Sequence, residues 1–168
     1  KTQRDAGKRA SAADILAEWK TVKQKQEGAR LGYKAFANVT KLELENHAID
    51  ALALEKADAM DQELKRDTTF SRFDQWPADG QLGLLSMAWA LGAPKIKANW
   101  PNLKAACRQE DFDAALKHCE ISTAGNPGVA KRNTENKRLF KNAAIVIANE
   151  GSNASQNLIA RRVLHYPN

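Results

Sequence analysis

The stretch from Trp76 to Gly92 constrains the fold of this chain more than any other. It is the most apolar run in the sequence, and turn-forming residues mark both of its ends. Pro77 suits the first turn of a helix, because the amide hydrogen that it lacks would have no partner there. Gly92 suits the left-handed position that closes a helix. The apolar side chains between them leave almost no polar face, so we predict a buried central helix from about Pro77 to Leu91.

Amphipathic segments lie on both sides of this stretch. Apolar residues recur at helical spacing in four of them, residues 11–26, 46–65, 111–119 and 133–149. The sustained alternation with a period of two that marks strands is missing. We therefore predict an all-α fold. A length of 168 residues fits one domain, so residues 1–168 are expected to form a single helical domain in which residues 1–10 are a loose lead-in.

The net charge of +6 favours polyanionic partners such as nucleic acid, anionic membrane surfaces or anionic cell-wall polymers. Lys and Arg are spread along the chain rather than gathered in a stripe, which makes a nucleic-acid-binding protein the weaker hypothesis. No apolar run reaches the ~20 residues that span a bilayer. The two cysteines, Cys107 and Cys119, are too few for a disulfide framework, and two buried free thiols are favoured over a bridge between them.

The sequence contains none of the common motifs for phosphate binding, zinc binding or a nucleophilic serine. His47, His118 and His165 lie far apart in unrelated contexts, so we predict no metal site and no cofactor. The most informative polar segment is the glycine-containing loop and helix start at residues 125–140. Asn126, Arg132 and Asn133 there offer amide and guanidinium groups that suit sugar hydroxyls, N-acetyl carbonyls or carboxylates. The alternative is that Asn133 only caps the helix while Arg132 is solvated.

Three segments resemble the helical lobe of the phage-type lysozymes and related glycoside hydrolases. The first joins Leu42-Glu43-Leu44 to the helix at Ala48-Ile49-Asp50-Ala51-Leu52. The second runs from Asp79-Gly80-Gln81 through Ser86 to Gly92, and the third is Lys131-Arg132-Asn133-Thr134-Glu135. They resemble, in order, the helix after the catalytic lobe, the central helix and the Arg-Arg-x-x-Glu segment of that family. The resemblance covers roughly residues 40–150.

The sequence departs from the family in its catalytic part. The family carries a catalytic Glu shortly before a Thr-x-Gly-x-Gly-His hairpin, and this chain has no such hairpin. In one alignment residues 11–22 match a segment that follows the hairpin, so that the Glu would lie upstream of Lys1. In the other, Glu27 is the catalytic acid within a diverged Glu-Gly-x-Arg-Leu signature. Glu18, beside Trp19 in sequence, is expected to be solvated. Ala90 stands where the family usually has Asn.

The resemblance implies a peptidoglycan-acting glycoside hydrolase, a muramidase, or the glycan-binding lobe of one. Cleavage of a glycosidic bond needs a protonated carboxylic acid beside the leaving oxygen, which Glu27 or an upstream residue would supply. Asn126, Arg132 and Asn133 would contact the glycan in a groove beside the central helix. The alternatives are a non-catalytic cell-wall binding module on the same scaffold and a basic nucleic-acid-binding protein. A wall-acting protein would be phage-derived or exported.

Overall fold

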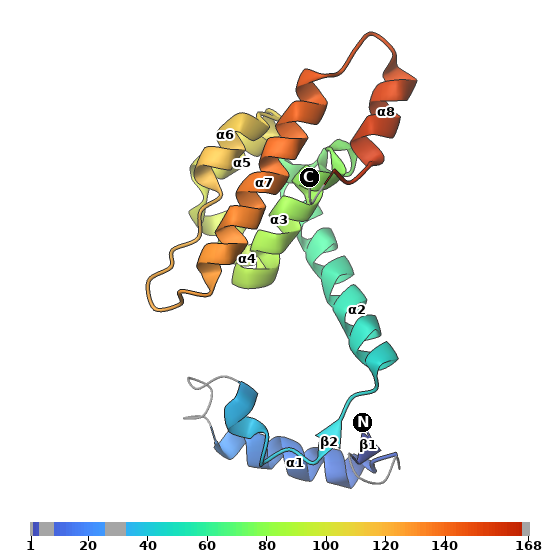
Figure 1. Cartoon of the computed structure of the whole chain (residues 1–168), viewed down its shortest axis with the longest axis vertical. Coiled ribbons are helices and arrows are strands. Elements are labelled where there is room, and N and C mark those ends of the chain that lie inside the picture. The colour runs from blue at the N-terminus through green and yellow to red at the C-terminus, as the bar shows by residue number, and fades with distance from the viewer. Residues whose placement is uncertain (1, 4–8, 26–32, 166–168) are drawn as a thin grey trace. The chain divides into compact units, whose positions relative to one another are not determined.

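The computed structural model describes residues 2–3, 9–25 and 33–165 (Figure 1). The chain divides into two compact units, residues 1–55 and 56–168. Helices dominate the described residues, and the strands found there are only two residues long, so the predicted all-α class is confirmed. The expectation of one domain over residues 1–168 stays a prediction.

The first unit contains a helix whose start was predicted from sequence. Helix α1 (Ala12–Gln24) begins at a capping box, in which the Ser11 hydroxyl accepts a hydrogen bond from the Asp14 amide at 3.2 Å. The Asp14 carboxylate in turn accepts from the hydroxyl and the amide of Ser11, and these bonds lower the pKa of Asp14. The helix buries none of its side chains, and Leu16 and Trp19 remain exposed.

A side-chain hydrogen bond links α1 to a short sheet in the same unit. Strand β1 (Thr2–Gln3) pairs antiparallel with β2 (Leu42–Glu43), and a 3₁₀ turn, η2 (Tyr33–Phe36), precedes β2. The Glu18 carboxylate accepts from the backbone amides of Lys41 and Leu42, the latter at 2.9 Å. The expectation that Glu18 is solvated is therefore wrong, because its carboxylate bonds two backbone donors at the start of β2.

Helix α2 (Asn46–Lys65) has the bounds that the apolar periodicity predicted. Its buried side chains are Met60 and Leu64, both near its C-terminal end, whereas Ile49 and Leu52 are about half exposed. Periodicity thus identified the helix, but only its last turns reach a hydrophobic core.

The second unit is built from helices and 3₁₀ turns. In chain order they are η3 (Thr68–Phe70), η4 (Phe73–Gln75), α3 (Ala78–Leu91), α4 (Ala93–Asn99), α5 (Pro101–Arg108), α6 (Phe112–His118), α7 (Val129–Ala148) and α8 (Ala154–Arg162). Helix α7 packs against both α3 and α6, and α5 packs against α6 and η3 (Figure 1). Asp111, the first residue of the predicted amphipathic segment 111–119, caps α6, since its carboxylate accepts from the Ala114 amide at 2.9 Å.

The predicted central helix is α3, and Gly92 ends it with a φ of 85°. Leu84 and Met87 are fully buried, in agreement with a central position. One face of the helix is open, because Leu82 and Trp89 are 38% and 49% exposed. The helix is therefore a wall of the core with an apolar outer face.

The core beside α3 is rich in aromatic rings. Trp76 contacts the rings of Phe70, Phe73 and Phe112, with centroid distances of 5.2 to 6.0 Å, and Phe112 stacks on Phe140. Cys107 and Cys119 are buried free thiols, as predicted. Burial raises the pKa of both thiols, that of Cys119 to about 11, so both are protonated and unreactive at neutral pH.

An ion pair anchors the start of η3 to α5. The Asp67 carboxylate caps η3 by accepting from the Thr69 amide at 2.9 Å, and it pairs with the Lys104 ammonium at 2.8 Å. Burial by itself would raise the pKa of Asp67, but the bonds from Lys104 and Thr69 outweigh it and hold the pKa at about 2.

This pair makes the stability depend on pH. The folded-state pKa of Asp67 is depressed, so its contribution is complete above about pH 4 and is lost as the pH falls towards 2. We expect Asp67→Asn to lower the free energy of unfolding by about 1–2 kcal/mol at pH 7 and by almost nothing at pH 2. Urea denaturation at both pH values measures this. The exposed control Asp58→Asn should change stability by less than about 0.5 kcal/mol, and an equal loss in the two variants would contradict the assignment.

Candidate functional site

The residues predicted to form the site do not all lie together. Glu27, the candidate catalytic acid, falls outside the described residues, so its role stays a prediction. Asn126 lies in the loop between α6 and α7 and is exposed, while its backbone amide donates to the Thr123 carbonyl at 3.0 Å. Arg132 and Asn133 lie on the first turns of α7, which begins at Val129, four residues before the expected start.

Arg132 joins α7 to the central helix. Its Nη1 donates to the Ser86 hydroxyl at 3.0 Å and to the Ser86 carbonyl at 3.1 Å. The interpretation of Arg132 as a simply solvated residue is therefore wrong. Trp89 lies three residues after Ser86, so the two share one side of α3. This side thus carries a hydroxyl, a guanidinium held against it, and a half-exposed indole ring.

Asn133 is turned to a different partner. Its Nδ2 donates to the Ile121 carbonyl at 2.7 Å, and its Oδ1 accepts from the Ile121 amide at 3.0 Å. The side chain is 5% exposed, so the amide acts as a buried clamp on the segment that follows α6. The alternative that Asn133 caps the helix is wrong, because Gly128 holds the N-cap position. The predicted glycan contact of Asn133 is untested, and its amide is already bonded on both sides.

Two further polar residues of the segment at residues 125–140, Glu135 and Asn136, also lie on α7. Asn136 is fully buried, and neither its Nδ2 nor its Oδ1 has a hydrogen-bond partner among the described residues. One carboxylate oxygen of Glu135 is likewise buried without a partner within that part of the chain. Such groups are costly unless satisfied. The signal in the sequence is that Asn136 lies four residues before Phe140, on the apolar face of the helix.

A hollow of about 470 Å³ lies beside the C-terminal half of α3. Residues from the last part of α2, the end of α3 and the start of α4 line it, among them Lys56, Met60, Glu63, Trp89, Leu91 and Pro94. Hydrogen bonds from Lys97 and Arg66, at 2.8 and 2.9 Å, lower the pKa of Glu63. Glu63 is therefore ionised at neutral pH and is unsuited to be a general acid.

Metal and membrane sites were searched for in the residues that the structure describes. No group of three or more His, Cys, Asp or Glu residues there could hold a metal ion. His47 pairs with Glu45 at 3.3 Å on the exposed start of α2. No described helix combines the length and the apolar character that crossing a membrane requires.

Comparison with known proteins returned no relative: the chain matches no family model, no curated protein and no solved structure.

The clamp made by Asn133 can be tested by its effect on stability. Asn133→Ala leaves the buried amide and carbonyl of Ile121 without partners, so we expect the free energy of unfolding to fall by about 2–4 kcal/mol. Thermal and urea denaturation measure this. Thr134→Ala, at the exposed neighbouring position on the same helix, should cost less than about 1 kcal/mol. Similar losses in the two variants would show that the Ile121 contact contributes little.

Proposed function

We propose that the protein acts on peptidoglycan, as a lysozyme-like muramidase or as the glycan-binding lobe of one. The observation that supports this best is the contact between Arg132 and Ser86. It joins the two segments that carry most of the resemblance, the central helix and the start of the late helix. Residues far apart in sequence that resemble parts of one binding lobe are thus in contact.

The chemistry of the surface is compatible with a glycan. Sugars present hydroxyl and amide groups together with flat apolar faces. Trp89 lines the hollow beside α3 and is 49% exposed, so its ring is available to pack against a sugar face. Exposed Asn126 and the guanidinium hydrogens of Arg132 that have no partner among the described residues add donors. The net charge of +6 favours attraction to anionic wall polymers.

Cleavage requires a carboxylic acid that stays protonated near neutral pH. The carboxylate in the lining of the hollow, Glu63, does not meet this condition because its pKa is lowered. In the proposed enzyme the acid is Glu27 or a residue upstream of Lys1. Without either, the same surface would serve a non-catalytic wall-binding module.

The enzymatic version of the proposal predicts the behaviour of Glu27→Gln. Wild-type protein should clear a suspension of purified cell walls, and Glu27→Gln should do so at least ~100-fold more slowly, because the amide cannot donate the proton. Loss of turbidity measures the rate, and Glu55→Gln, on the exposed face of α2, is the matched control.

Each outcome of this assay bears on one version. Equal clearing by wild type and Glu27→Gln would contradict the assignment of Glu27. Wild-type protein that pellets with walls without clearing them would contradict the enzyme and support the binding module. Retention on heparin that is lost at modest salt, without pelleting on walls, would overturn the proposal in favour of general polyanion binding.

The binding surface predicts a separate effect of Trp89. Trp89→Ala should weaken pelleting with purified walls by about tenfold, since loss of one well-placed aromatic contact costs on the order of 1 kcal/mol or more. The titration of bound against free protein measures the change. Leu82→Ala removes another exposed apolar side chain from α3 and should leave binding unchanged. Equal effects of the two substitutions would show that Trp89 makes no specific contact with the glycan.

A further inference from the structure

Helix α8 is held in the second unit by polar contacts rather than by buried apolar side chains. None of its side chains is buried, and Leu158 and Ile159 are 47% and 65% exposed. Arg161 binds the Glu150 carboxylate with two nitrogens and donates to Glu110 at 3.0 Å. Its Nη1 also donates to the Gln75 carbonyl at 2.7 Å. A single guanidinium thus connects α8 to three separate segments.

Two further anchors lie on either side of Arg161. The Asn157 amide bonds the carbonyl and the amide of Gly151, at 2.7 and 3.1 Å. After α8, the backbone amide of His165 donates at 2.8 Å to Asp79, a fully buried carboxylate on α3. Asn142 of α7 donates to the same carboxylate at 3.1 Å. These bonds hold the segment from Gly151 to His165, and no side chain fills the space between α8 and α7.

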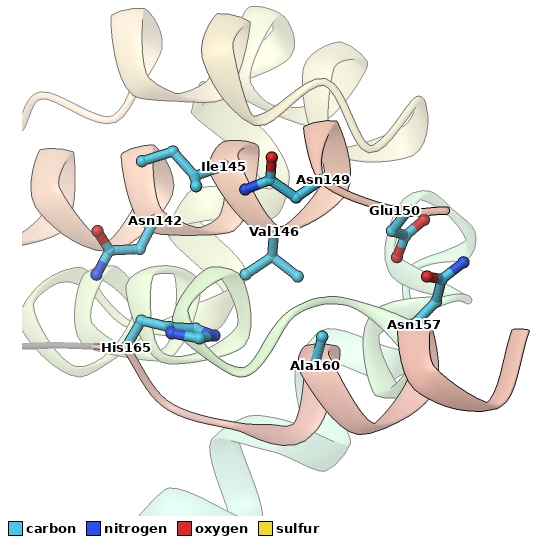
Figure 2. Close-up of a pocket in the computed structure, with 8 residues that line it drawn as sticks. All are labelled: Asn142, Ile145, Val146, Asn149, Glu150, Asn157, Ala160 and His165. Carbon is cyan, nitrogen blue, oxygen red and sulfur yellow. The ribbon is translucent and has the colours of Figure 1, made fainter. Parts of the chain in front are cut away.

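That space is a cavity of about 360 Å³ (Figure 2). One wall is formed by Asn142, Ile145 and Val146 of α7 together with Asn149 and Glu150, which follow the helix. The other wall is formed by Asn157, Ala160 and His165. Figure 2 shows the side chains of Val146 and Ala160 facing the space between the two helices, with the His165 ring beside them. The volume is at the lower end of the range of small-molecule sites, ~300–1,000 Å³.

The polar groups of the lining differ in whether they can still form hydrogen bonds. Glu150 is neutralised by Arg161, and the Asn157 amide is bonded to Gly151. The Nε2 atom of His165 is buried and has no hydrogen-bond partner within the described part of the chain. The cavity therefore combines apolar side chains, a neutralised carboxylate, the side-chain amides of Asn142 and Asn149, and one buried imidazole nitrogen without a partner among the described residues.

We propose that the cavity between α7 and α8 binds a small uncharged molecule that has an apolar body and one hydroxyl or amide group, which bonds to His165 Nε2. A charged ligand would find no unpaired opposite charge in the lining, because Arg161 and Glu150 neutralise each other. The site shares no lining residue with the hollow beside Trp89. It is thus separate from the proposed glycan surface, and neither proposal depends on the other.

The experiment uses two probes of similar shape, benzyl alcohol and toluene, titrated into the full chain and followed by amide and methyl NMR. For a ligand of this size we expect benzyl alcohol to bind with a Kd on the order of 1 mM. Toluene, which lacks the hydroxyl, should bind at least threefold more weakly. His165→Phe keeps the backbone bond to Asp79 but removes Nε2, so it should abolish the difference between the probes.

Filling the cavity gives an independent check. Ala160→Phe should abolish binding of both probes, whereas Ile159→Phe, at the exposed position beside it, should retain binding. Nuclear Overhauser contacts between benzyl alcohol and the methyl groups of Val146 and Ile145 locate the probe in wild-type protein without any variant. Absence of these contacts, binding that survives Ala160→Phe in a folded variant, or equal affinity of the wild type for the two probes would overturn the proposal.

Discussion

The close packing of α3 on α7 is the contact on which the second unit depends. Two glycines of α3 make it possible: a Cβ atom at Gly80 would lie 3.3 Å from the Cβ of Ala143 on α7 and 2.9 Å from the Phe112 ring on α6. A Cβ atom at Gly83 would lie 3.2 Å from the Phe140 ring on α7. These distances are shorter than ordinary carbon contacts, so side chains there would push the helices apart. Phe112 also contacts Trp76, and the same glycine contacts therefore connect the helix pair to the aromatic core.

The direction in which α3 packs on α7 places the two candidate sites towards opposite ends of α3. The helices are antiparallel, because Ser86 meets Arg132 near the start of α7 whereas Asp79 meets Asn142 farther along it. The proposed glycan surface lies towards the C-terminal end of α3. The cavity between α7 and α8 lies towards the N-terminal end of α3, where buried Asp79 also holds the backbone of His165. One helix pair thus supports two chemically different surfaces.

The polar residues of α7 show why sequence reasoning could not assign the role of each side chain. The sequence predicted Arg132 and Asn133 as glycan donors, and in the structure they are bonded to Ser86 of α3 and to Ile121 in the segment after α6. An Asn that binds a ligand and an Asn that clamps a distant backbone have the same local sequence signal. Only the position of the partner, 12 residues away along the chain, distinguishes them.

The sequence by itself determined the local features: the all-α class, the capping box at Ser11, the cap at Asp111, the bounds of α2, and α3 with its end at Gly92. Each depends on residues within about one helical turn, where propensity and hydrogen bonding act directly. The tertiary structure alone decided that Trp89 is exposed, that Asn133 is a clamp, and that Arg161 holds α8. These outcomes depend on groups from other elements, such as the Gln75 carbonyl bound by Arg161, and no local pattern records where the chain will bring them together.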